Sequence, residues 1–281
     1  MHTMNKKLWI ILVLMSGIVK SQDLTVMTYN IRYDNPKDSL DGWEQRSAFL
    51  SSQVRFLEPA VFGTQEGLHH QLEDLTNALP GYEFFGKGRD HGDQRGEYSA
   101  VFYKKDQLRL LDQGTFWLSE TPDIPSVGWD AALNRVCTYG LFNTLEGDKK
   151  FYVFNAHLDH MGETARQKSL ELIIEKVKTL NTDQYPVILM GDFNLEPDHP
   201  SIKQLSGEMK DAHDLAPTAF KGPTGTYNGF NMDELPTRRI DYIFLSPGDF
   251  SVQRYRIISE MVNGRYPSDH FPVVARLRFL P

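Results

Sequence analysis

The segment 187–194 places the tightest constraint on how this chain can fold. Its apolar half, residues 187–190, is bounded by a proline and a glycine and is typical of a fully buried strand. The segment ends in Asp192 and Asn194, one residue apart. A carboxylate beside a buried strand costs on the order of several kcal/mol unless a cation or hydrogen-bond donors meet it. The segment therefore predicts a charged partner, with an Asx-turn that merely caps the strand as the alternative.

Four other strand-like segments end in, or lead out of, the same kinds of residue. These residues are Asn30, Glu66, His157, Asp159, Asp269 and His270. Oxygen ligands from Asn, Asp and Glu suit Mg²⁺, Mn²⁺ or Ca²⁺, and the sequence has no Cys/His cluster of the kind that binds structural zinc. The set predicts a distributed metal and general-base site, in which Mg²⁺ is favoured and Mn²⁺ or Ca²⁺ is the alternative.

The first 21 residues have the pattern of a secretory signal peptide. Two lysines precede an apolar run over 8–19, and the small residues Val19 and Ser21 precede an expected cut before Gln22. The run is short for a membrane span, so an uncleaved anchor is the weaker alternative. Because Cys137 is the one cysteine, no lipid-anchoring cysteine follows the run and no internal disulfide can form. We therefore expect an exported protein, periplasmic or extracellular, without stable membrane insertion.

Composition limits the size of the fold and the kind of partner. The chain has 281 residues, of which 40% are hydrophobic, which is enough for a packed core. It contains no repeat and no linker rich in Pro, Gly or Ser, so we expect one domain over 22–281 and a monomer. Removing residues 1–21 takes away three lysines and no acid, so the formal charge changes from −7 to −10. That balance disfavours a basic groove for long nucleic acid, although bound divalent ions could still support nuclease activity.

The order of the predicted elements indicates an α/β protein. Helices are predicted over 41–57, 68–79, 163–180 and 200–205. Strands are predicted over 24–31, 61–66, 98–103, 108–111, 115–118, 136–145, 151–157, 187–190, 239–245, 252–258 and 273–279. Consecutive strands between 98 and 157 favour antiparallel pairing and hence mixed sheets. Residues 86–97 are predicted to form a Gly-rich polar loop. The loop 119–134 is of a size that is usually functional or mobile, with a surface excursion around a packed Trp as the alternative.

Taken in order, the motifs resemble those of the endonuclease/exonuclease/phosphatase family. They are Tyr29-Asn30-Ile31-Arg32, Gln65-Glu66, Gly96-Glu97-Tyr98, Arg135, His157-Leu158-Asp159, Gly191-Asp192-Phe193-Asn194, Ile240-Asp241-Tyr242-Ile243 and Ser268-Asp269-His270-Phe271-Pro272-Val273. The resemblance extends over residues 24–275. The resemblance implies a four-layered α/β-sandwich of two mixed β-sheets flanked by helices, with the site where strand ends converge.

By position, the resemblance implies a metal site built on Glu66. Glu66 would be the principal ligand, helped by Asn30 and Asp269. Asp192 and Asn194 would hold the attacking water and the phosphate, or a second metal.

The resemblance also implies two oriented histidines. His270 would pair with a buried Asp241, and His157 would be oriented by Glu97. A carboxylate partner fixes the tautomer of a histidine and raises the basicity of its far nitrogen, which proton transfer requires. The alternative for Asp241 is an ion pair with one of the two preceding arginines, and the alternative for His157 is a satisfied core histidine.

Three further kinds of residue are candidates for substrate contact. Arg135 suits a planar phosphate clamp because strand-like sequence follows it. Asp159 could contact metal or substrate, and a turn role is its alternative. The candidate stacking platforms, for which core packing is the alternative, are Trp43, Trp117, Trp129 and Tyr139.

These expectations lead to one function and two alternatives. We expect an exported phosphoesterase that depends on a divalent metal and hydrolyses a phosphate mono- or diester by His/Asp-assisted attack of water. A phosphorylated small molecule or glycan is favoured, because the sequence contains no basic helix or loop for gripping a duplex and no apolar hairpin-like insertion. A secreted nuclease is the alternative, and a non-catalytic binding module on the same scaffold is a remote one.

Overall fold

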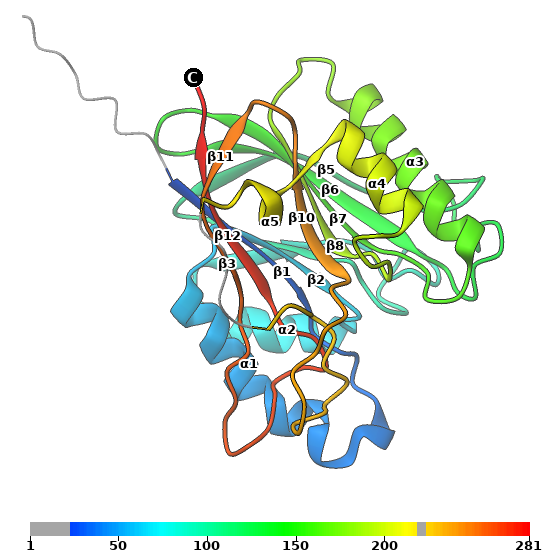
Figure 1. Ribbon diagram of the computed structural model, residues 1–281, viewed down its shortest axis with the longest axis vertical. Coiled ribbons are helices and arrows are strands. Elements are labelled where there is room, and N and C mark those ends of the chain that lie inside the picture. The colour runs from blue at the N-terminus through cyan, green and yellow to red at the C-terminus, as the bar shows by residue number, and fades with distance from the viewer. Residues whose placement is uncertain (1–22, 218–222) are drawn as a thin grey trace, which may run out of the picture.

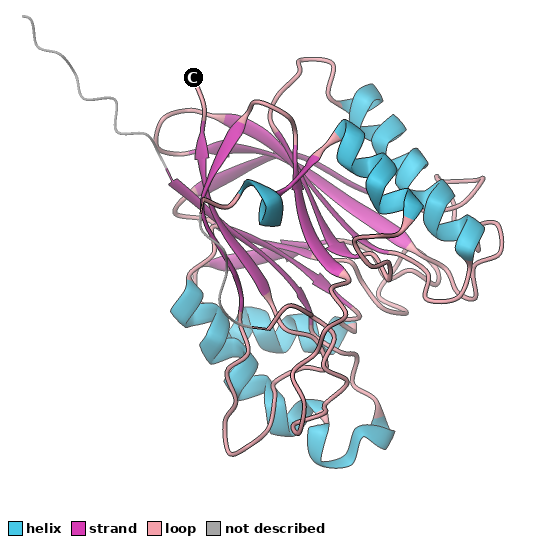
Figure 2. Cartoon of the chain, viewed as in Figure 1, coloured by secondary structure: helices cyan, strands magenta, loops and turns pink. Residues whose placement is uncertain are grey.

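Two six-stranded sheets lie face to face at the centre of the molecule, and helices cover their outer faces (Figure 1). This computed structural model describes residues 23–217 and 223–281. The export signal predicted over 1–21 lies outside the described residues. The layers run helix, sheet, sheet, helix (Figure 2), which confirms the four-layered α/β-sandwich. Within the described ranges, every helix is too short or too polar to cross a membrane.

The first sheet has the strand order β11-β12-β1-β2-β4-β3. Its strands are β1 (Asp23–Asn30), β2 (Val61–Gln65), β3 (Tyr82–Phe85), β4 (Val101–Lys104), β11 (Phe250–Ile257) and β12 (Val273–Phe279). Strands β1 and β2 are parallel, whereas β1 and β12 are antiparallel, so the sheet is mixed. The helical elements on this side are η1 (Pro36–Asp41), α1 (Trp43–Leu57) and α2 (His69–Ala78).

The second sheet has the strand order β5-β6-β7-β8-β10-β9. Its strands are β5 (Leu108–Trp117), β6 (Val136–Thr144), β7 (Lys150–His157), β8 (Val187–Asp192), β9 (Lys210–Asp211) and β10 (Asp241–Leu245). Strands β7 and β8 are parallel, and β10 runs antiparallel to β8. The remaining helices are α3 (Glu163–Leu180), α4 (Pro200–Glu208) and the short α5 (Ala212–Leu215); α3 and α4 cover this sheet.

Most predicted elements are present, and the differences have local causes. The helix predicted from residue 41 begins at Trp43, because a 3-10 helix occupies 36–41. The two strands predicted over 108–111 and 115–118 are one strand, β5, whose pairing with β6 shifts register between Leu110 and Asp112. Such a bulge breaks the apolar alternation that marks a strand in sequence. The short elements β3, β9 and α5, at 82–85, 210–211 and 212–215, carry too few residues for a periodic signal.

The core consists of three apolar clusters, one for each interface between the four layers. The central cluster fills the space between the sheets, and the other two lie between each sheet and its helices. Along β8, Ile188 and Met190 join the central cluster, while Val187 and Leu189 pack toward α3 and α4. Strand β8 is therefore buried on both faces, which explains why its sequence is continuously apolar.

One polar side chain crosses the apolar space between the sheets. Asn155 of β7 is fully buried, and its Nδ2 donates to the backbone oxygens of Thr64 (2.9 Å) and Ala100 (2.8 Å) in the first sheet. Its Oδ1 accepts from Gln65 Nε2 at 2.6 Å. A Cβ at Gly63 would lie 2.4 Å from the Asn155 carboxamide, so a glycine is required opposite it. Asn155 thus fixes β7 against the end of β2.

Asn155→Ala should lower the free energy of unfolding by about 3 kcal/mol, because it removes three buried hydrogen bonds. Asn143→Ala is the matched control, since this β6 asparagine donates only to the Asp148 side chain and should cost less than about 1 kcal/mol. Urea unfolding of both variants measures the difference. Equal losses would show that Asn155 does not hold the sheets together.

Candidate active site

A polar cavity of about 490 Å³ opens where the strand ends of both sheets converge. The parallel strand pairs β1–β2 and β7–β8 end at this edge. Strand β12, antiparallel to β1, and strand β10, antiparallel to β8, begin at the same edge. Eight of the eleven residues predicted from sequence line the cavity: Glu66, Glu97, Arg135, His157, Asp192, Asn194, Asp269 and His270. The structure therefore brings these residues, which lie in distant segments of the sequence, together at one cavity.

The register of three neighbouring strands sets the centre of the site. In the second sheet Asp192 of β8 pairs with His157 of β7 on one side and with Asp241 of β10 on the other. Gly191, directly before Asp192, has φ +145°, and a Cβ there would lie 1.9 Å from the backbone oxygen of Ala156. Only glycine allows β7 and β8 to approach this closely beside the site.

Asn30 joins the two sheets at the floor of the cavity. Its Nδ2 donates to Glu66 Oε1 and to Asp192 Oδ2, both at 3.0 Å. Its Oδ1 accepts from the backbone N–H of Arg32 at 3.0 Å. Asn30 was expected to be a metal ligand, but its oxygen is engaged and its nitrogen faces the carboxylates. Its role here is to hold Glu66 and Asp192 in position.

The acidic groups in the cavity fit a hard divalent cation. One ligand atom from each of Glu66, Asp192 and His270 lies within 4.8 Å of the others. Asp269, the other predicted ligand, faces Glu66 across Arg32, whose Nη1 is 3.9 Å from Glu66 Oε2 and 3.7 Å from Asp269 Oδ2. The donors are mainly carboxylate oxygens, which Mg²⁺, Mn²⁺ and Ca²⁺ prefer.

His270 is held by Asp241 and faces Asp192. Its Nδ1 is 2.9 Å from Asp241 Oδ2, and its Nε2 is 3.7 Å from Asp192 Oδ2. Burial lowers the pKa of His270, but the charges of Asp241 and Asp192 outweigh burial and raise this pKa well above its usual value. These charges therefore favour the protonated form of the ring. The alternative ion pair of Asp241 is not seen, since Arg239 pairs with Asp211 at 2.7 Å.

Asp192 is a buried carboxyl group whose pKa lies close to neutral pH. Burial raises the pKa of Asp192 to about 7, and the charge of Asp241 adds to the rise. Its Oδ1 accepts from the backbone N–H of Asn194 at 3.0 Å, which leaves Oδ2 toward His270 and His157. A group with a pKa near the working pH is suited to proton transfer.

His157 is neutral and is oriented by a neighbour other than the predicted one. Its Nε2 lies 3.2 Å from Asn194 Nδ2 and 3.5 Å from Asp192 Oδ2. Burial and the charge of Arg135 lower the pKa of His157 well below its usual value. The predicted partner, Glu97, accepts two 2.7 Å hydrogen bonds from Arg89 instead, and no hydrogen bond joins it to His157 in the described part of the chain.

Asp159 supports Arg135 and does not line the cavity. Its Oδ2 accepts from Arg135 Nε at 3.2 Å, and its Oδ1 accepts from the backbone of Met161 and Gly162 at 2.9 and 2.8 Å. The expectation of substrate or metal contact is therefore wrong for Asp159, and the turn alternative holds. Arg135 is buried, its Nη2 lies 3.0 Å from His160 Nδ1, and its Nη1 has no hydrogen-bond partner among the described residues.

The predicted stacking residues lie away from the cavity. The indoles of Trp43 and Trp117 are buried and donate to Asp74 and to the backbone of Arg89, each at 2.7 Å. The aromatic residues that do line the cavity are Tyr33 and Tyr227. The ring of Tyr227 stands edge-on to His270, with 5.1 Å between centroids. Tyr227 could not be found from sequence, because an isolated bridge to His270 brings it there from a polar loop.

Several charged residues of the cavity were also missed. They are Arg32, Arg89, His160 and Arg238. Arg32 closes the Tyr29-Asn30-Ile31-Arg32 motif, and His160 directly follows His157-Leu158-Asp159, so adjacency to a motif was an available signal for both. Arg89 and Arg238 lie in loops, where the sequence has no periodicity from which the direction of a side chain could be predicted.

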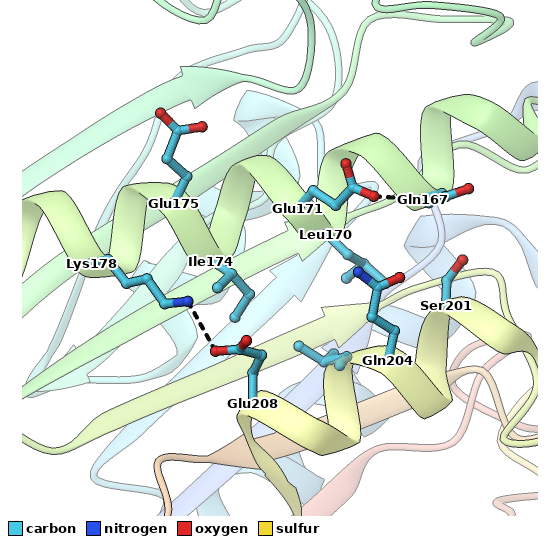
Figure 3. Close-up of a pocket in the computed structure, with 10 residues that line it drawn as sticks. Gln167, Leu170, Glu171, Ile174, Glu175, Lys178, Ser201, Gln204 and Glu208 are labelled. Atoms are coloured by element: carbon cyan, nitrogen blue, oxygen red, sulfur yellow. Dashed lines mark hydrogen bonds and ion pairs between the residues drawn. The ribbon is translucent and has the colours of Figure 1, made fainter.

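A second hollow of about 350 Å³ lies between α3 and α4 (Figure 3). Leu170 and Ile174 point into it, and Lys178 and Glu208 form an ion pair of 2.9 Å across one end. Its lining contains acids and one lysine but no histidine. The buried histidines, and the carboxyl groups whose pKa values are raised, line the first cavity instead.

Comparisons with known proteins agree with this geometry. Residues 27–270 match a model described as the Endonuclease/Exonuclease/phosphatase family. A solved endonuclease/exonuclease/phosphatase family protein from Bacteroides thetaiotaomicron is 41% identical, with 93% of this chain and 99% of that chain covered and a TM-score of 0.89. A mannosyl-6-phosphatase from Bacteroides thetaiotaomicron VPI-5482 is 42% identical, with 90% and 99% covered and a TM-score of 0.86. An uncharacterized protein of Acanthamoeba polyphaga mimivirus is 30% identical over 55% of this chain, which spans 60% of that relative's length.

The free energy of unfolding of the metal-free protein should fall as the pH rises from 5 to 8. In the folded protein the pKa values of Asp192 and Glu97 are about 7 and that of Asp269 is about 6, so these groups keep protons that the unfolded chain has released. The raised pKa of His270 extends the fall in the free energy of unfolding above pH 6.5. The lowered pKa of His157 opposes this fall, but only below pH 6.5. Each such proton changes stability by about 1.4 kcal/mol per pH unit.

Thermal unfolding in chelator across this pH range measures the fall. Asp192→Asn should flatten the slope below pH 7. A stability that rises between pH 5 and 8 would contradict the assigned directions.

Proposed function

This chain belongs to the endonuclease/exonuclease/phosphatase family, and from that premise we propose that it is an exported phosphoesterase that depends on a divalent metal. The observation that carries the proposal is the row of His157, Asp192 and Asp241 across three strands, with His270 and Glu66 beside it. This arrangement places an acid, a base and a set of oxygen ligands in one cavity. The pattern of residues 1–21 supports export.

Glu66 and Asp269 would hold the metal, with Asp192 beside them, and Mg²⁺ is favoured because the donors are carboxylate oxygens. A bound Mg²⁺ would polarise a phosphoryl oxygen and offset the charge that develops in the transition state. Asn30 keeps Glu66 and Asp192 within reach of each other, since it donates to both at 3.0 Å.

The histidines and Asp192 would supply the acid-base chemistry. Asp192 Oδ2 would accept a proton from the attacking water, because its pKa of about 7 lies near the working pH. The raised pKa favours a protonated His270, whose Nε2–H would stabilise the negative charge on the phosphate and then give its proton to the leaving alkoxide. Asp192, whose Oδ2 is 3.7 Å from this nitrogen, would return to His270 the proton that it took from water. Asp241 fixes the His270 ring through Nδ1 at 2.9 Å. Neutral His157 and Asn194, 3.2 Å apart, would contact a phosphate oxygen.

The cavity suits a small phosphate ester. Its volume of about 490 Å³ lies within the range of small-molecule sites, and Tyr33 and Tyr227 line it as possible faces for a sugar ring. Arg135, which lines the cavity and is largely buried, would bring a positive charge close to a bound phosphate. The mannosyl-6-phosphatase among the similar structures supports a sugar phosphate as substrate. A secreted nuclease is the second candidate, because four arginines line the cavity and could meet a longer anionic chain.

We expect the protein without residues 1–21 to release phosphate from hexose 6-phosphates with Mg²⁺ and to lose this activity in chelator. Parallel assays should use a chromogenic phosphodiester and supercoiled plasmid, with Mn²⁺ and Ca²⁺ as alternative ions. Nicking of plasmid without phosphate release would favour the nuclease. Inactivity on every ester with every ion would favour the binding module.

His270→Ala should lower kcat by about 10²–10⁴-fold while the fold stays intact, because the imidazole supplies both a charge and a proton. His70→Ala is the matched control, since this half-exposed histidine pairs only with Asp34 and lies outside the cavity. Steady-state kinetics with circular dichroism compare the two. Turnover near that of the unchanged protein would remove His270 from the mechanism.

A further inference from the structure

Arg32 brings a fixed positive charge between the two carboxylates expected to hold the metal. We propose that Arg32 is a built-in counter-ion of Glu66 and Asp269, which organises them before metal binds and weakens the affinity of the site for a divalent cation. The inference rests on the proposed function, because it assumes that these carboxylates receive the metal. The structure supports it at three levels: the backbone, the guanidinium and its distances to the acids.

The backbone of Arg32 is held in a conformation that side-chain-bearing residues rarely adopt, with φ +55°. Three hydrogen bonds fix it there. Its N–H donates to Asn30 Oδ1 at 3.0 Å, and its carbonyl oxygen accepts from Arg46 Nη2 at 2.6 Å and from Gln71 Nε2 at 3.0 Å. Arg46 and Gln71 are both buried, so the surroundings determine where the Arg32 side chain begins.

The guanidinium is anchored so that one nitrogen remains for the site. Nε and Nη2 donate to the two oxygens of Asp38 at 2.9 and 3.0 Å, a two-pronged geometry that sets the plane of the group. Asn35 Nδ2 donates to Asp38 at 3.0 Å and holds that acid in turn. The guanidinium also lies over the ring of Tyr33, 4.7 Å from its centroid. Nη1 is the nitrogen left to face Glu66 and Asp269.

The contacts of Nη1 with the two acids are electrostatic and lack hydrogen-bond geometry. Nη1 is 3.9 Å from Glu66 Oε2 and 3.7 Å from Asp269 Oδ2, beyond the usual hydrogen-bond range of about 2.7–3.2 Å. The charge reduces the repulsion between the acids but does not occupy their oxygens. A divalent cation on the same oxygens would lie close to Arg32 and be repelled by it. Arg32 therefore stabilises the metal-free site and disfavours the metal-bound one.

The test is the affinity of the substrate-free protein for Mn²⁺. The protein is first freed of chelator and then titrated with Mn²⁺, and electron paramagnetic resonance measures the concentration of the free ion. Arg32→Gln should bind Mn²⁺ about tenfold or more tightly than the unchanged protein, because a nearby positive charge is gone. The metal-free variant should also melt at a lower temperature, since Glu66 and Asp269 then repel each other. Arg32→Lys keeps the charge and should change the affinity much less.

Arg238→Gln is the matched control, because Arg238 lines the same cavity but pairs with Glu196 at 3.1 Å. The affinity of this variant for Mn²⁺ should equal that of the unchanged protein. Arg32→Leu gives the same comparison if Arg32→Gln does not fold. Unchanged or weaker Mn²⁺ binding by a folded Arg32→Gln or Arg32→Leu, while the unchanged protein binds Mn²⁺, would overturn the inference and leave the proposed function standing. If neither protein binds Mn²⁺, Mg²⁺ or Ca²⁺, the inference falls together with the metal dependence.

Discussion

The carboxamide of Asn155 connects two sheets whose contact with each other is mainly apolar. Apolar packing has no direction, so it holds the sheets together without fixing how far one slides along the other. Asn155 supplies that direction with three hydrogen bonds to the end of β2 and to Ala100. The site depends on it because Glu66 directly follows β2 of one sheet and Asp192 ends β8 of the other. Asn30 repeats the arrangement at the cavity floor, where it donates to both acids.

Much of the fold and of the site could be predicted because strands leave clear marks in sequence. An apolar run that ends in Asp192 or Glu66 predicts both the strand and the polar group at its end, and parallel neighbours bring such ends to one edge. The partner of each side chain could not be predicted in the same way. Glu97 binds Arg89, and Asp159 binds Arg135, through loop segments whose directions depend on long-range contacts. Arg32 stands in one of the motifs, but the direction of its side chain could not be predicted, because Asp38 of a 3-10 helix sets it.

The charges of the cavity are arranged in opposed pairs, and this explains how so many can be buried. His270 lies between Asp241 and Asp192, and Arg32 lies between Glu66 and Asp269. Each cation reduces the repulsion between two acids that would otherwise destabilise the folded chain. The same pairing separates the protonation states of the two histidines, since His270 lies among carboxylates and His157 lies near Arg135. Opposite environments thus give one residue type two different states within a single cavity.

The alignment of His157, Asp192 and Asp241 across adjacent strands has a consequence for how such a protein can change. Side chains alternate between the two faces of a sheet, so an insertion or deletion of one residue within β8 would turn Asp192 to the opposite face and break the row at once. The geometry of the candidate site is therefore tied to the length of β8. New specificities would have to arise in the loops that border the cavity, such as 119–134 and the segment that carries Tyr227, where length can vary without disturbing the ladder.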